Sequence, residues 1–147
     1  MFEPVNRFTF PEPADLFLGY DVSEIVGIAD KVKAVFAAVQ PASDPMVDFD
    51  ERDLVTFAER AGFTEVHVQL SIDIEPAQAR AWTTLVNSSG NPRVPTLGEA
   101  MGQALTADEA ERLTSHLRPL VENGIGQRRS AVAYLWALRP RSPGEVD

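Results

Sequence analysis

The stretch FAERAGFTEVHVQLSIDIE, residues 57–75, decides how this sequence is interpreted. Its first part has the pattern of a helix end, and Gly62 supplies the left-handed residue that commonly terminates a helix. From Glu65 onward, polar and apolar residues alternate strictly, which predicts a strand with one apolar and one polar face. The apolar face is formed by Val66, Val68, Leu70, Ile72 and Ile74. Such a strand requires a sheet to join and a core beneath it.

A second strand signal lies near the other end of the chain, in the segment RRSAVAYLWALRP. Its residues Ser130–Leu138 are almost continuously apolar, which is typical of a strand covered on both faces and predicts that Trp136 is a core residue. Two strands alone form a marginal sheet, and the second of them has the composition of a central strand. The sequence therefore contains fewer strands than its own sheet requires.

Five helices are expected around these strands. Four of them have N-terminal caps, formed by the pairs Asp21 with Glu24, Asp50 with Asp53, Thr96 with Glu99, and Thr106 with Glu109. The second helix carries a stripe that predicts burial of Leu54, Phe57, Ala58 and Ala61. Pro76 suits the first turn of the third helix, and Gly124 is expected to end the last one.

Composition places the chain among ordinary globular proteins and excludes several classes. The 147 residues suit a single domain, and 44% of them are hydrophobic. A formal net charge of -9 gives no general attraction to phosphate backbones or anionic lipid, so neither nucleic acid nor a membrane is expected as a partner. The chain has no cysteine, which excludes disulfides and thiolate chemistry. No signal-peptide pattern is found, and a cytoplasmic location is the default expectation.

The order of these segments resembles the C-terminal half of a class I S-adenosylmethionine-dependent methyltransferase. FAERAGFTEVHV is similar to the family's helix, glycine and sixth strand, and RRSAVAYLWALRP to the antiparallel seventh strand that lies between the fifth and sixth. MFEPVNR resembles the exit of the fifth strand. The resemblance implies an α/β fold, part of a Rossmann-like sheet, in one domain over residues 1–147. Residues 76–124 would form a helical cap insertion, and residues 139–147 a frayed tail.

The sequence departs from the family in its cofactor-binding elements. The family binds S-adenosylmethionine with a Gly-rich turn after its first strand and an acidic residue at the end of the second. No Gly-rich turn between a strand and a helix occurs in this chain: the two glycines of ENGIGQ, residues 122–127, follow a helix and precede a strand, the reverse of the required order. The cofactor is thus implied by resemblance alone, and we expect the isolated chain to bind it weakly or not at all.

Candidate substrate-binding residues follow from position and size. Glu3, Asn6 and Arg7 lie just past the fifth strand of the resemblance, and ligands of open α/β sheets bind outside the carboxyl ends of strands. The alternative is an N-terminal segment ordered only by packing. Tyr20 follows in the same region of the sequence. Trp82 and Met101 are large apolar groups that could line a substrate pocket or belong to the core.

The chain has two histidines, His67 and His116, and they are the candidates for a catalytic base. His67 lies on the polar face of its strand, which is more often a solvated face. His116 belongs to the last helix of the cap. The histidines have no acidic residues at ligand spacing beside them, so no metal site is expected.

Two functions of different classes fit this pattern. In the first, the chain is the substrate-side portion of a methyltransferase acting on a small molecule, and a separate N-terminal half binds the cofactor. In the second, it is a non-catalytic, truncated relative that dimerises or binds a small molecule. A natural truncation, a split-enzyme subunit and a misplaced start codon are all compatible with the sequence, which does not specify the substrate or the methylated atom.

A homodimer is also expected from the exposed edge of the Ser130–Leu138 strand. Residues Met1–Val5 contain Pro4, which donates no hydrogen bond, so we expect them to restore little of the ladder on that edge. An apolar strand with an open edge is a template for pairing with another chain.

Overall fold

The computed structural model describes residues 1–140 and divides into two compact units. The sheet unit contains Met1–Phe10, Pro45–Asp73 and the described residues from Ser130 onward. The helical unit contains Pro11–Asp44 and Ile74–Arg129. The mixture of helices and antiparallel sheet confirms the α/β class. Residues 76–124, the expected cap, belong with Pro11–Asp44 to the helical unit.

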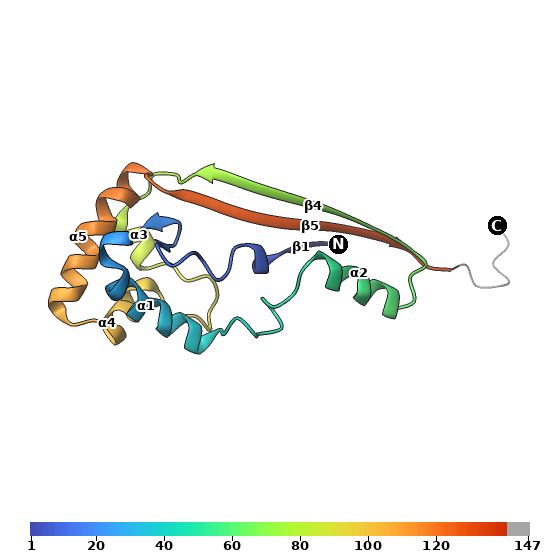
Figure 1. The fold of residues 1–147 in the computed structure, drawn as a ribbon, viewed down its shortest axis with the longest axis horizontal. Coiled ribbons are helices and arrows are strands. Elements are labelled where there is room, and N and C mark those ends of the chain that lie inside the picture. The colour runs from blue at the N-terminus through green and yellow to red at the C-terminus, as the bar shows by residue number, and fades with distance from the viewer. Residues whose placement is uncertain (141–147) are drawn as a thin grey trace. The chain divides into compact units, whose positions relative to one another are not determined.

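The sheet has three strands in the order β1-β5-β4 (Figure 1). They are β1 (Phe2–Pro4), β5 (Gln127–Leu138) and β4 (Glu65–Pro76). β1 runs antiparallel to β5. β4 is antiparallel to β5 as well, because Thr64 N donates to Leu138 O at one end of the pair and Ala77 N donates to Gly126 O at the other, both at 3.0 Å. β1 and β4 are therefore parallel to each other on either side of β5.

The pairing of β1 shows why its proline is tolerated. Leu135 N donates to Met1 O at 2.9 Å, and Val5 N donates to Ala131 O at 2.8 Å. Backbone groups of alternate residues point to opposite edges of a strand, so Pro4 N faces away from β5 and its missing N–H costs no bond in this ladder. Our reason for expecting little pairing here is therefore wrong, because Met1–Val5 cover the β5 edge from Ala131 to Leu135.

One face of the sheet is covered by α2 (Glu51–Arg60). Leu54 packs in a small core with the buried residues Val5, Ala131 and Ala133. Asp50 caps this helix as predicted: its side chain accepts from Asp53 N at 3.1 Å, and Asp53 Oδ2 accepts from Asp50 N at 3.0 Å. The cap fixes where α2 begins, and the apolar face of the helix then closes the core.

Among residues 1–140, nothing covers Tyr134 and Trp136 on the opposite face of β5, which corrects the prediction of a strand buried on both faces. Trp136 is 53% exposed and stacks on His67 with 5.2 Å between ring centroids, so it is no core residue. Tyr134 is also exposed and contacts Phe2, with ring centroids 6.0 Å apart. Continuous apolar sequence identified the strand correctly, but it did not reveal that only the alternate residues toward α2 would be buried.

The helical unit has its own, larger core. Its helices are α1 (Val26–Val39), α3 (Trp82–Val86), α4 (Leu97–Ala104) and α5 (Ala107–Asn123). The capping boxes predicted at Thr96 and Thr106 are both present. The expected third helix is shorter than predicted, because β4 continues to Pro76 and the helix begins only at Trp82. The fully buried residues include Val22, Val32, Leu113, Leu117 and Val121.

A tight turn joins the short strands β2 (Leu16–Phe17) and β3 (Tyr20–Asp21) and contacts the start of β5. Gly19 has φ +83°, and its carbonyl accepts from Gln127 N at 2.8 Å. A Cβ at Gly19 would lie 2.0 Å from the carbonyl oxygen of Gln127. The turn thus needs glycine both for its backbone conformation and for this close approach.

Gly62 provides a matched control, because it has φ +86° but no neighbouring atom that a Cβ would meet. We expect Gly62→Ala to lower the free energy of unfolding by about 1–2 kcal/mol, the cost of a left-handed alanine. Gly19→Ala carries the same conformational cost and a backbone clash, so it should destabilise the protein more. Urea unfolding of both variants measures the difference, and equal losses would contradict the close packing of this turn.

Candidate functional site

The polar candidates nearest the end of β1 lie in a short 3-10 helix, Asn6–Phe8, that directly follows the buried Val5. Arg7 projects toward the loop before α2. Its Nε lies 3.8 Å from Asp48 Oδ1, and its Nη1 lies 3.8 Å from Asp50 Oδ2. The three side chains form a partly exposed cluster, which we call the Arg7 cluster. The carboxyl end of β1 and the beginning of α2 position it.

Asp50 has two roles in this cluster, because it caps α2 and faces Arg7. The backbone N–H of Asp53 lowers the pKa of Asp50, and the N–H of Arg52 and the charge of Arg7 act in the same direction. The carboxylate therefore stays ionised well into the acidic range. An ionised cap is favourable at the positive end of the helix and keeps Arg7 oriented.

The Arg7 cluster offers hydrogen-bond donors and acceptors at one position. Arginine presents a planar fork of donors, and its distances of 3.8 Å to both carboxylates leave room for a further acceptor. Asn6 uses its backbone carbonyl to accept from Thr9 N and Phe10 N, at 2.9 and 2.8 Å. Its side chain makes no hydrogen bond to any part of the chain that the structure describes. The arrangement can orient a small polar group, and both of its carboxylates, Asp48 and Asp50, face Arg7.

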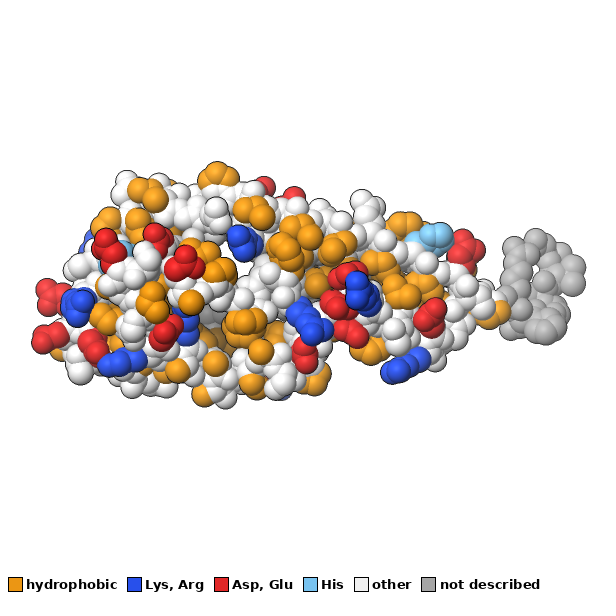
Figure 2. Space-filling model, viewed as in Figure 1, with side chains coloured by type: hydrophobic (Ala, Val, Ile, Leu, Met, Phe, Trp, Pro, Cys, Tyr) orange, Lys and Arg blue, Asp and Glu red, His pale blue; other side chains and the backbone are white. Residues whose placement is uncertain are grey.

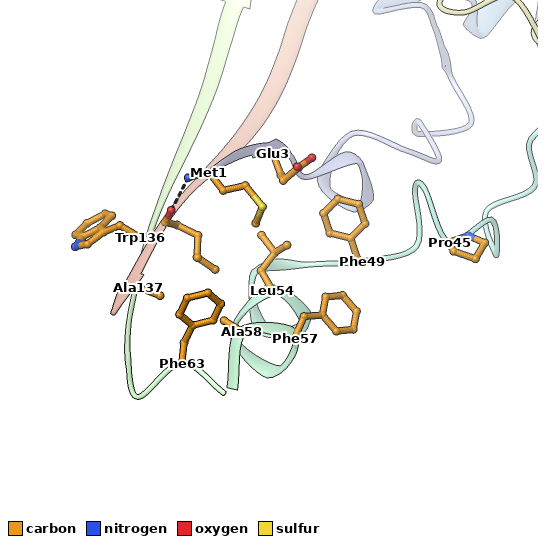
Figure 3. A pocket seen from close by; sticks show the side chains of 11 residues that line it. Met1, Glu3, Pro45, Phe49, Leu54, Phe57, Ala58, Phe63, Trp136 and Ala137 are labelled. Atoms are coloured by element: carbon orange, nitrogen blue, oxygen red, sulfur yellow. Dashed lines mark hydrogen bonds between the residues drawn. The ribbon is translucent and has the colours of Figure 1, made fainter. Parts of the chain in front are cut away.

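Glu3 is separated from this cluster and lines a groove on the α2 face of the sheet (Figure 3). The groove encloses about 760 Å³ and is mainly apolar. Its aromatic walls are Phe49, Phe57 and Phe63, whereas the ring of Trp136 points away from it. The half-buried carboxylate of Glu3 has no ion pair or hydrogen bond among residues 1–140. The residues that line the groove are Met1, Glu3, Pro45, Phe49, Leu54, Phe57, Ala58, Phe63, Leu135, Trp136 and Ala137.

Sequence reasoning missed most of this groove. Phe57 was predicted to be buried in the stripe of α2, yet it is 54% exposed. Phe49 and Phe63 flank the helix in the sequence and gave no periodic signal. The sequence did contain one signal for the groove. Phenylalanine is in excess on both sides of a short helix, and that helix has only a narrow sheet face to cover.

The other three candidate substrate residues belong to the core of the helical unit. Tyr20, Trp82 and Met101 are 2%, 9% and 8% exposed and pack in one apolar cluster. Tyr20 also packs against Gly126, where a Cβ would lie 2.7 Å from the tyrosine ring. Their burial among apolar neighbours favours the core alternative over a substrate pocket.

The two histidines lie in different units and make different contacts. His67 Nε2 lies 2.9 Å from Glu65 Oε1 on the exposed face of β4. His116 Nε2 lies 2.8 Å from the carbonyl oxygen of Asp21. Hydrogen bonds from Ser23 chiefly lower the pKa of Asp21, and His116 adds a smaller effect. Each histidine is thus accounted for by a local contact, and neither lies in the Arg7 cluster or the groove.

The chain's glycines do not form a cradle for S-adenosylmethionine. Across residues 1–140, the glycines with positive φ are Gly19, Gly62 and Gly124. A Cβ at Gly124 would meet the backbone of Ala77 and Ala79, so this glycine allows protein packing and not the approach of a ligand. Gly19 has the same role, and Gly62 ends a helix. The residues present do not fit the cofactor of the resembled family.

Comparisons with protein-family models, with curated proteins and with solved structures found no match to this chain. Within residues 1–140, no helix is long and apolar enough to cross a membrane, and no three histidine or acidic side chains gather as metal ligands. On the face shown in Figure 2, acidic and basic side chains are interspersed, without a large patch of one sign. A functional proposal must therefore rest on the strands and the two sites described above.

The lowered pKa of Asp50 predicts the pH dependence of its contribution. A carboxylate whose pKa is lower in the folded state stabilises the protein above its unfolded pKa, near 3.8, and loses that effect as the pH falls through the folded value. Asp50→Ala should lower the midpoint of thermal unfolding at pH 7 and have a smaller effect near pH 2. Calorimetry at both pH values tests this, with Asp50→Asn as a control that keeps a capping side chain. A loss independent of pH would contradict the role of the charge.

Proposed function

We propose that this chain supplies the substrate-side portion of an S-adenosylmethionine-dependent methyltransferase that acts on a small molecule. The cofactor-binding portion is a separate half with the Gly-rich turn that residues 1–147 lack. The part of a Rossmann-like sheet that the chain provides consists of β1, β5 and β4, which take the places of the fifth, seventh and sixth strands of the family.

The order and direction of the strands is the single observation that carries this proposal. The resemblance implied that the last strand lies between the first and the middle strand and runs antiparallel to both. The sheet order β1-β5-β4 and the antiparallel pairing of β1 with β5 agree with that implication. β1 and β5 are separated by more than a hundred residues, so their pairing does not follow from the local sequence.

The Arg7 cluster supports a role on the substrate side. It follows the carboxyl end of β1, where ligands bind in open α/β sheets. Asn6 and Arg7 would hold a polar group of the substrate, with Asp48 and Asp50 orienting the guanidinium. Glu3, the third candidate of this region, lies on the groove instead and is not part of this proposed contact.

A fusion protein tests the proposal. The cofactor-binding half of a class I methyltransferase, ending before that enzyme's fifth strand, is joined in front of Met1. We expect calorimetric titration to detect S-adenosylmethionine binding by the fusion and none by residues 1–147 alone. The fusion should bind because β1 and β5 complete the donor's sheet.

The donor half without residues 1–147 is the first control, and the fusion with Val132→Pro is the second, because a proline within β5 disrupts its pairing. A folded fusion that binds no cofactor, although the intact donor enzyme does, would refute the proposed function. Micromolar binding of S-adenosylmethionine by residues 1–147 alone would refute the proposal that a separate half binds the cofactor.

A dimerising module is the second candidate function, and one observation favours it. Apolar side chains are exposed on the sheet face opposite α2, among them Phe2, Tyr134 and Trp136. Exposed patches of this kind often mark protein interfaces. Sedimentation at micromolar concentration should then show a dimer that Trp136→Lys dissociates. A monomer at every concentration would exclude this candidate.

A further inference from the structure

Glu3 is an acidic residue on an otherwise apolar face of the sheet. Side chains alternate along a strand, so Glu3 lies on the same face of β1 as Val5, which is 3% exposed in the core beneath α2. Its neighbour across the ladder on β5 is the buried Ala133. Phe2 lies on the opposite face, where its ring contacts Tyr134. A carboxylate at such an inward position is costly unless something pairs with it.

No group within residues 1–140 neutralises this carboxylate. Glu3 is half-buried, and it forms no ion pair or hydrogen bond in this part of the chain. Cations on neighbouring segments are engaged elsewhere: the ammonium of Met1 donates to Leu135 O at 2.8 Å, and the guanidinium of Arg7 faces the carboxylates of its own cluster. A cationic group from outside the chain would therefore find Glu3 available for a charge-assisted hydrogen bond.

The groove beside Glu3 has the size and lining of a small-molecule site (Figure 3). Its volume of about 760 Å³ lies within the range of roughly 300–1,000 Å³ that is common for ligand sites. Its walls come from β1, the loop before α2, α2 itself, the turn before β4 and the end of β5, all of which belong to the sheet unit. Glu3 has the one charged side chain among the lining residues within 1–140. One charged group in an apolar cavity can fix the orientation of a ligand.

The aromatic walls give the groove a second reason to bind a cation. Phe49, Phe57 and Phe63 line it, and the face of a phenylalanine ring attracts positive charge. Phe63 already makes such a contact, because the guanidinium carbon of Arg139 lies 5.4 Å from the centre of its ring. Glu3 would repel the carboxylate of a fatty acid, so the groove selects against anionic ligands.

We propose that the groove is a binding site for a small molecule that carries an ammonium group on an apolar, preferably aromatic, body. The ammonium pairs with the carboxylate of Glu3, and the body lies against Phe49, Phe57 and Phe63. The inference goes beyond the proposed function, because the site needs neither S-adenosylmethionine nor a separate cofactor-binding half.

Probes that share a naphthyl body test the site on residues 1–147. They are the cationic naphthylethylamine, the neutral naphthylethanol and the anionic naphthylacetate, and equilibrium dialysis at neutral pH measures the dissociation constant of each. We expect the amine to bind about fivefold more tightly than the alcohol, the upper range for an ion pair at a partly exposed site, and the acetate to bind most weakly. Failure of the folded chain to bind the amine would overturn the proposal. Equal affinity for amine and alcohol would also overturn it and leave Glu3 as an inward charge that protects the edge of β1 from pairing.

Glu3→Gln separates the carboxylate from the general negative charge of the chain. The substitution keeps the size of the side chain, and it should abolish the preference for the amine over the alcohol. Glu59→Gln is the matched control, because Glu59 is exposed on α2, does not line the groove and changes the net charge of -9 by the same amount. The preference should survive in this control. Equal losses in the two variants would show attraction to the net charge alone and overturn the site.

Glu3→Lys gives the opposite charge to the same position. We expect this variant to bind naphthylacetate more tightly than naphthylethylamine, because the sign of the attraction is reversed. A variant that still prefers the amine would overturn the role of Glu3.

Phe57→Ala tests the apolar part of the site. Phe57 is 54% exposed, so its truncation should leave the fold intact, which urea unfolding checks. The amine and the alcohol should both bind about fivefold more weakly, because apolar area buried against the ring is lost. Phe2→Ala is the matched control, since Phe2 is 61% exposed on the opposite sheet face, and it should bind both probes as the unaltered chain does. Binding that is lost in Phe2→Ala and kept in Phe57→Ala would place the probes on the opposite face and overturn the groove as their site.

Sedimentation of the unaltered chain tests whether a second copy supplies the cation instead. A dimer that Glu3→Gln dissociates would place a lysine or arginine of a second copy in the groove and overturn the small-molecule site. A monomer, or a dimer that Glu3→Gln leaves unchanged, would support the proposal, because the groove is then open to the amine.

Discussion

The pairing of β5 with its two neighbours is the interaction on which the rest of the sheet unit depends. β5 comes from the end of the chain, β1 from its beginning and β4 from its middle, so their hydrogen bonds join segments that are distant in the sequence. α2 packs on the face that this pairing creates, and its core residues have no other surface to bury. The Arg7 cluster also depends on this pairing, because its position is set by the end of β1 and the cap of α2.

The two sites of the sheet unit have opposite chemistry. The Arg7 cluster is polar, partly exposed and held by charge, whereas the groove is apolar with a single unpaired carboxylate.

Local signals in the sequence predicted local structure well. The caps at Asp50, Thr96 and Thr106 and the left-handed residue Gly124 were identified correctly, because a cap depends on neighbours within one turn. The capping box predicted at Asp21 was wrong: Asp21 accepts from Ser23 N, and neither the 3-10 turn Ser23–Ile25 nor α1 has a side-chain cap. Burial was predicted less well. Trp136 and Phe57 have the composition and spacing of core residues, but burial also depends on whether another element covers them, and neither is covered within residues 1–140. Asn6 and Arg7 were expected just past a strand end and do follow β1, while the groove required the packing of α2 on the sheet to be known.

Pro4 has a consequence for how this protein behaves at high concentration. Its ring removes a donor from the outward edge of β1, which is left with the carbonyl groups of Phe2 and Pro4 and the single N–H of Phe2. Two copies of such an edge could exchange bonds only between their Phe2 residues, and the carbonyls of Pro4 would be left without donors. The proline therefore acts as a gatekeeper against strand-by-strand growth into fibrils, while it still accepts a partner that brings its own N–H groups.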